Sequence, residues 1–159
     1  MTRDDPAMPR TVTITGTRST GHRDLDSYRQ LFEGYVRPFA GPGIRFYLGG
    51  AAGIDSLALL WLARESAVAL SVVVPATLTD QPAGARHAIT TVRRNGRLDE
   101  LVELRGEART PGYHARNRWM VDRSDLVIGF PRGDNPASGT AYTLRYAGSQ
   151  RKPRLVVPV

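Results

Sequence analysis

Short apolar segments alternate along the chain with longer segments whose apolar residues recur every three or four positions. Continuous β-branched or apolar runs predict buried strands, and the three-to-four spacing predicts amphipathic helices. We expect strands at residues 11–15, 44–48, 70–74, 101–104, 126–130 and 155–157. We expect helices at residues 24–39, 54–62, 84–94, 113–123 and 139–148.

The clearest helical pattern follows the capping candidates Asp24, Asp26 and Ser27. Its apolar residues are Tyr28, Leu31, Phe32, Tyr35, Val36 and Phe39. Their spacing predicts a helix that continues to Phe39 and ends before residues 41–43, Gly-Pro-Gly.

This alternation predicts an α/β fold, a single Rossmann-like three-layer α/β/α domain with a mainly parallel sheet. The length of 159 residues fits one domain. We expect residues 1–10 to form a loose N-terminal tail and residues 11–159 to form the domain.

Composition narrows the function classes. The chain has no cysteine, which excludes thiol catalysis, Cys-ligated zinc and disulfides. No apolar run approaches the ~18 residues of a membrane span, and the N-terminus has no apolar signal core. We therefore expect a cytoplasmic protein that does not enter a membrane.

The net charge is +7, from 22 Lys and Arg against 15 Asp and Glu. All but Lys152 of the cations are arginine, and they are spread along the chain. An arginine-rich codon bias and an anionic partner both explain this excess. Charge alone therefore does not predict DNA binding.

Three glycine-containing turns follow expected strands: residues 16–21, 49–53 and 131–140. In open α/β sheets ligands bind beyond the carboxyl ends of the strands, where the strand order reverses. These turns are therefore the candidate binding segments.

The first turn is close to the phosphate loop G-x-x-x-x-G-K-[ST], but His22 and Arg23 replace the lysine and the hydroxyl that the motif needs. A triphosphatase is therefore not favoured. Gly16, Thr17 and Arg18 instead suit one phosphate or carboxylate, and an ordinary glycine turn is the alternative.

The second turn contains Gly49, Gly50 and Gly53, and Asp55 follows it at the start of the expected helix. Small residues let a ligand approach the N-terminus of the following helix, where free N–H groups favour anions. The alternatives are pure turn geometry for the glycines and helix-start stabilisation for Asp55.

Two further candidate groups are Arg116 with Arg118, on one expected helix, and the segment Ser138, Gly139 and Thr140, which opens another. Both groups suit an anion. The alternative for the two arginines is a solvated helix face, and the alternative for Ser138 or Thr140 is a simple N-cap. Arg118 and His114 could face one anion. Arg118 could instead pair with Asp122.

The sequence contains no G-x-S-x-G elbow, no H-E-x-x-H pair and no aspartyl dyad. Asp134, inside the third turn, and Asp55, two residues after the second, are the catalytic candidates. The three histidines show no metal-ligand spacing, so we expect neither a metal nor a bound cofactor.

Taken in order, the motifs resemble the SLOG superfamily, which includes the DprA/Smf Rossmann domain, the LOG phosphoribohydrolases and small stand-alone YspA-like proteins. The resemblance rests on residues 15–18 ("GSR" turn), 49–55 ("GGArGID"), 116–121 ("RNRxM"), 124–131 with 138–140 ("aDlviafPgG…GT") and 156–158 (closing strand).

The resemblance implies that the 125–130 strand lies beside the 11–16 strand. It also implies a pocket over Gly16–Arg18, Gly49–Gly53 and Gly139–Thr140 that binds a nucleotide or nucleotide-derived molecule. A homo-oligomer is compatible with it.

One departure concerns catalysis. Thr143 stands where LOG enzymes carry their catalytic glutamate, and threonine cannot supply that negative charge. Nucleotide binding is therefore the favoured function. Hydrolysis of a nucleoside monophosphate at its N-glycosidic bond, with Asp55 or Asp134 as the carboxylate, and DprA-like single-stranded DNA binding are the alternatives.

Overall fold

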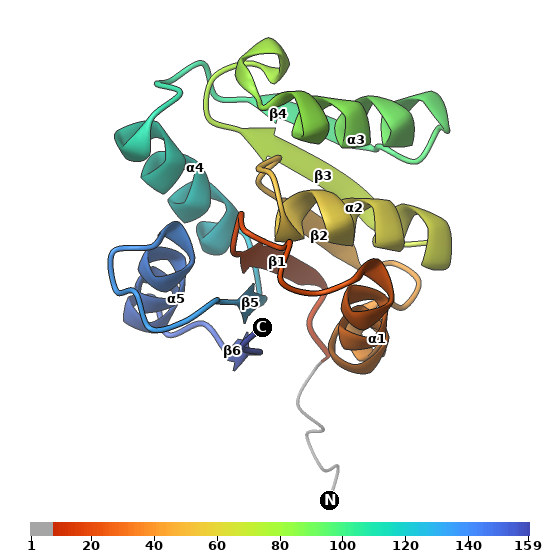
Figure 1. The fold of residues 1–159 in the computed structure, drawn as a ribbon, viewed down its shortest axis with the longest axis horizontal. Helices are drawn as coiled ribbons and strands as arrows, with labels where there is room; N and C mark the ends of the chain where they lie inside the picture. Colours follow the sequence, from red (N-terminus) through yellow and green to blue (C-terminus); the bar gives the residue numbers. More distant parts are fainter. Residues whose placement is uncertain (1–7) are drawn as a thin grey trace, which may run out of the picture.

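The computed structural model describes residues 8–159, so most of the expected tail at residues 1–10 lies outside the described part (Figure 1). The strands are β1 (Thr11–Gly16), β2 (Arg45–Leu48), β3 (Ala69–Val74), β4 (Glu100–Glu103), β5 (Leu126–Phe130) and β6 (Arg154–Val156). The helices are α1 (Leu25–Tyr35), α2 (Ile54–Glu65), α3 (Ala83–Arg94), α4 (Thr110–Asp122) and α5 (Gly139–Ser149), with short 3-10 turns η1 (Arg37–Phe39) and η2 (Leu78–Asp80).

The strands form one parallel sheet in the order β4-β3-β2-β1-β5-β6, which confirms the predicted fold class. From β1 the chain moves outward to β4, crosses back to β5 on the other side of β1, and ends at β6. Because such crossovers are right-handed, α1, α2 and α3 cover one face and α4 and α5 cover the other (Figure 1). The strand order reverses between β1 and β5.

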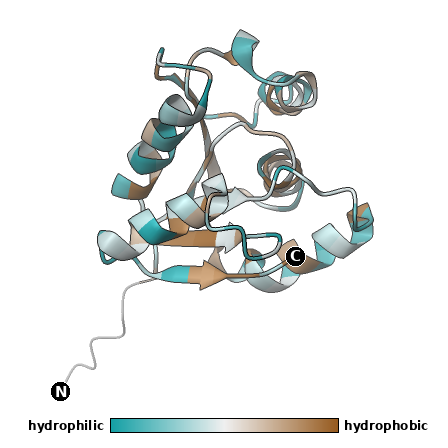
Figure 2. Cartoon of the chain, turned by 60° about the vertical axis from the view of Figure 1, so that its left-hand side comes forward, coloured by the Kyte–Doolittle hydropathy of each residue, from teal (hydrophilic) through white to brown (hydrophobic). Residues whose placement is uncertain are grey.

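The sheet has a hydrophobic layer on each face. In β2, Phe46 and Leu48 belong to the large core packed against α1, α2 and α3, whereas Tyr47 packs with Met120 of α4 on the opposite face. Hydrophobic colours concentrate on the strands and hydrophilic colours on the outer helix surfaces (Figure 2). This double burial explains why the strands are nearly continuous apolar runs.

Three helix boundaries differ from the sequence prediction by three residues or more, and one of them is the end of α2, at Glu65 instead of Leu62. The first helix ends at Tyr35 and not at Phe39, because Pro38 has no N–H for the helical ladder and the chain tightens into η1. The expected 113–123 helix begins at Thr110, since Pro111 suits a first helical turn. Among residues 8–159, no helix combines the length and the apolar character that crossing a bilayer requires.

Candidate functional site

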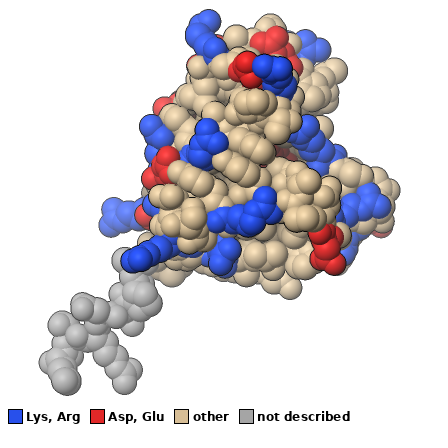
Figure 3. All heavy atoms as spheres, turned by 90° about the vertical axis from the view of Figure 1, so that its left-hand side faces the viewer, with Lys and Arg blue, Asp and Glu red and all other residues tan. Residues whose placement is uncertain are grey.

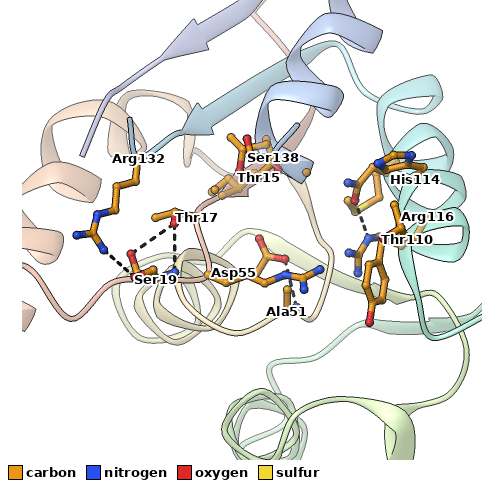
Figure 4. A pocket seen from close by; sticks show the side chains of 18 of the residues that line it. Thr15, Thr17, Ser19, Ala51, Asp55, Thr110, His114, Arg116, Arg132 and Ser138 are labelled. Atoms are coloured by element: carbon orange, nitrogen blue, oxygen red, sulfur yellow. Dashed lines mark hydrogen bonds between the residues drawn. The ribbon is translucent and has the colours of Figure 1, made fainter. Parts of the chain in front are cut away.

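A cavity of about 370 Å³ lies over the carboxyl ends of β1 and β5, where the strand order reverses. Its wall is built from the β1–α1 loop, the start of α2, the first half of α4, the β5–α5 loop and the N-terminus of α5 (Figure 4). This is the location at which open α/β sheets bind ligands.

The β1–α1 loop is held in place by backbone bonds to two other elements. The Thr17 N–H donates to the Phe130 carbonyl at 3.0 Å, and the Ile54 N–H donates to the Thr17 carbonyl at 3.0 Å. Within the loop, the Ser19 N–H donates to Thr17 Oγ1 at 3.1 Å. These bonds fix the loop, and Gly16, Thr17 and Arg18 line the cavity.

Glycines of the second turn lie behind the cavity wall. Their lack of a side chain leaves room for the backbone and the arginine side chain that form this wall. Gly53 has φ +77°, and a Cβ there would overlap the Thr17 carbonyl and lie 2.7 Å from Arg18 Cα. A Cβ at Gly49 would lie 2.8 Å from the Arg116 guanidinium carbon. Gly50 has φ +65°, and its carbonyl accepts a bond from the Gln81 amide at 2.6 Å. These three glycines thus shape the site without lining it.

Arg116 is a buried cation in the cavity wall, with 4% of its surface exposed. Its guanidinium donates to the Gly49 carbonyl, and its Nε donates to Asn117 Oδ1 at 2.6 Å. Burial lowers the pKa of Arg116, and the nearby carboxylate of Asp55 opposes that shift. These bonds fix the guanidinium beside Asp55, deep in the site.

Asp55 brings a carboxylate to the cavity from the first turn of α2, and it is 7% exposed. Its Oδ2 accepts a bond from the Ala51 N–H at 3.2 Å. Burial raises the pKa of Asp55 to about 6, although Arg116, the Ala51 N–H and Arg18 act in the opposite direction. Removal from water therefore outweighs the attraction of two cations at this position.

Two exposed arginines flank the cavity. The Arg18 guanidinium lies over the Tyr113 ring, 4.6 Å from its centroid. Arg132, from the β5–α5 loop, donates to Ser19 Oγ at 2.7 Å (Figure 4). Together with Arg116, they place three arginines from three chain segments around one cavity.

The N-terminus of α5 adds backbone donors to the same cavity. Ser138 caps the helix by accepting from the Ala141 N–H at 3.1 Å. Ser138, Gly139 and Thr140, three of the candidate binding residues, all line the cavity. The positive end of the α5 dipole thus favours an anion in this cavity.

Arg118 lies on another face of α4, outside the cavity lining. Its Nη1 donates to the Tyr142 hydroxyl at 2.7 Å, whereas Asp122, its predicted alternative partner, accepts from the Tyr146 hydroxyl at 2.5 Å. The His114 ring lines the cavity and stacks on Tyr142, 3.7 Å between centroids. Burial, Arg118 and Arg145 lower the pKa of His114.

Two of the three residues considered for hydrolysis, Thr143 and Asp134, lie outside the cavity lining. Thr143 is fully buried, and its hydroxyl donates to the Gly139 carbonyl at 2.8 Å. Asp134 is exposed in the β5–α5 loop, outside the cavity lining. If the protein hydrolyses an N-glycosidic bond, Asp55 is therefore the carboxylate placed to take part.

Sequence reasoning missed Arg132 and Tyr113 as cavity residues. Arg132 follows β5 at its carboxyl end, so its position in the chain was a usable signal. Tyr113 reaches the cavity only because α4 packs across the sheet beside α5, which no local pattern indicates. Basic side chains are spread over the face formed by α4 and α5 rather than gathered in one patch (Figure 3).

Comparison with solved structures identifies DprA proteins of the same fold. DNA processing protein A from Helicobacter pylori, described for its single-stranded DNA binding mode, matches with a TM-score of 0.71 and 26% identity. DprA from Streptococcus pneumoniae matches with a TM-score of 0.68 and 19% identity. The matches cover 96% and 94% of this chain, but only 66% and 50% of the DprA chains.

A third similar structure is the structural genomics target TM1055, with a TM-score of 0.60 and 17% identity over 91% of this chain and 72% of that one. No family model and no curated protein matches the sequence. The structural neighbours are consistent with the SLOG resemblance, and the shared fold is that of DprA and TM1055.

Proposed function

We propose that this protein binds a nucleotide, or a nucleotide-derived molecule, with its phosphate in the cavity over β1 and β5. One observation carries the proposal: Arg18, Arg116 and Arg132 converge with the N-terminus of α5 on a cavity of about 370 Å³. Guanidinium groups and helix N-termini are the two protein features best suited to a phosphate.

The phosphate fits best on the side of Arg132, Ser19 and Ser138–Thr140. Arg132 is exposed and its guanidinium has donors beyond the one given to Ser19, so it can make a two-pronged bond. Arg116 is committed to Gly49 and Asn117, and therefore contributes mainly its charge.

A thermal-shift screen tests this function. The four ribonucleoside 5′-monophosphates, the matching nucleosides and inorganic phosphate are each added at millimolar concentration. We expect at least one monophosphate to raise Tm more than its nucleoside does, because ligand at 100 times its Kd adds about 2.7 kcal/mol of stability. Failure of all four monophosphates to shift the transition contradicts the proposal.

Single-stranded DNA is the second candidate, supported by the likeness to the Helicobacter pylori protein. Arg18 lies over the ring of Tyr113, with Arg132 in the lining of the same cavity, and a cation next to an aromatic ring suits single strands. We expect oligonucleotide binding to be weak and steeply dependent on salt. A sub-micromolar Kd for a 15-nucleotide strand at about 150 mM salt favours DNA as the ligand instead.

A further inference from the structure

Asp55 is the one carboxylate among the described residues that line the cavity. It lies among three arginines and is almost completely buried. A cavity built only to hold a phosphate gains nothing from a carboxylate, because two anions repel each other at short range in a poorly solvated site. Its presence therefore indicates that part of the ligand is not anionic.

The bonding of Asp55 leaves it free to accept more hydrogen bonds. An ionised carboxylate has about four acceptor sites; the Ala51 N–H takes one of those on Oδ2, and the Gly49 backbone N–H also stabilises the carboxylate. The Arg116 side chain directs its own bonds to Gly49 and Asn117. Asp55 thus reaches the cavity with unused acceptor capacity.

The exposed cation Arg132 lies apart from Asp55 in the cavity (Figure 4). Figure 4 places Arg132 and Ser19 on one side, His114 and Arg116 on the opposite side, and Asp55 between the two. A phosphate held at Arg132 and the α5 N-terminus leaves the region of Asp55 to the neighbouring part of the ligand. In a nucleotide, that part is the sugar, whose hydroxyls are hydrogen-bond donors.

We propose that Asp55 accepts a hydrogen bond from a ribose hydroxyl and so makes the cavity selective for nucleotides with free sugar hydroxyls. This inference rests on the proposed nucleotide function and specifies its ligand class. Nucleotides inside a DNA strand lack the 2′-hydroxyl and have an esterified 3′-oxygen. They cannot satisfy Asp55, so free ribonucleotides are favoured over DNA.

The test is a calorimetric titration of each ribonucleoside 5′-monophosphate and of its 2′,3′-dideoxy counterpart. A hydrogen bond to a charged acceptor corresponds to about a 10- to 100-fold difference in affinity. We expect the dideoxy compounds to bind about that much more weakly to the wild-type protein.

The matched variants are Asp55→Asn and Asp134→Asn. Asp55→Asn removes the charge while nearly keeping the shape, and we expect it to reduce the ribo-to-dideoxy ratio to about 3-fold or less, because a neutral acceptor binds a hydroxyl more weakly. Asp134 is exposed outside the cavity lining, so its variant keeps the wild-type ratio.

The outcomes separate this inference from the proposed function. Equal binding of ribo and dideoxy compounds by the wild-type protein overturns the role of Asp55 and leaves phosphate recognition intact. An unchanged ratio in Asp55→Asn does the same. Absence of binding by every nucleotide overturns both proposals, and the wild-type comparison decides the matter even if the variant fails to fold.

Discussion

At the scale of single residues, Asp55 is the position where stability and function oppose each other. Its burial raises its pKa to about 6, from an ordinary value of 3.8. The folded state therefore holds the proton more tightly than the unfolded state does. It follows that the contribution of Asp55 to stability is complete below about pH 4 and is lost as the pH rises through about 6.

We predict that Asp55→Asn abolishes this loss of stability with rising pH. Two pKa units correspond to about 3 kcal/mol, so the unfolding free energy of the variant relative to wild type should rise by up to that amount between pH 4 and pH 7. Urea denaturation of both proteins across this range measures the difference. A difference that stays flat or falls contradicts the burial of an ionisable Asp55.

Arg118 provides the second prediction at this scale. Because its guanidinium bonds to Tyr142 and lies outside the cavity lining, its placement favours the structural alternative over the ligand role. We expect Arg118→Ala to lower the unfolding free energy by about 1 kcal/mol, the contribution of one hydrogen bond, while nucleotide affinity stays within about 2-fold. Loss of affinity without loss of Tm would restore Arg118 to the binding site.

At the scale of elements, the sequence predicted the positions of the strands closely. It did not predict that glycines of the second turn lie behind the cavity wall. Apolar runs such as residues 126–130 identify a strand directly, because both faces of the sheet are buried. Gly49 and Gly53 could be recognised as turn residues, but the partners that need their lack of a side chain, Arg116 and the Thr17–Arg18 backbone, come from distant segments. Only the packed structure distinguishes a glycine that supports the cavity wall from one that lines it.

Two glycine substitutions test this distinction. Gly53→Ala forces a Cβ onto the Thr17 carbonyl at a φ of +77°, and we expect it to lower the unfolding free energy by at least about 2 kcal/mol. Gly139→Ala has open space around its Cβ at the start of α5, and we expect stability to be unchanged or raised by up to about 1 kcal/mol.

Nucleotide titration completes the comparison. Since Gly139 lines the cavity, its variant should bind nucleoside monophosphates more weakly although its Tm is not lowered. A Gly53→Ala protein as stable as wild type, or a Gly139→Ala protein with a clearly lower Tm, would show that the roles of the two turns have been misassigned.

At the scale of the whole molecule, the net charge of +7 is a weaker guide than the position of a few cations. Basic side chains are spread over the α4–α5 face, whereas three arginines meet at the reversal of strand order (Figure 3). The family resemblance implied this neighbourhood of the 11–16 and 125–130 strands, and glycine turns follow both of them. The sequence marked the segment that contains Arg132 but not the residue itself, whose partner Ser19 is 113 positions away in the chain.

The most direct test of the central claim is calorimetric titration of the four ribonucleoside 5′-monophosphates into wild type, Arg132→Ala and Arg94→Ala. Arg132 is exposed and faces the proposed phosphate, whereas Arg94 is exposed at the end of α3, outside the cavity lining. We predict that Arg132→Ala weakens binding by about 10- to 100-fold at unchanged Tm, the effect of losing a charge-assisted bond, while Arg94→Ala binds as wild type does. Equal affinity of all three proteins, or equal losses in both variants, would contradict a phosphate site in this cavity.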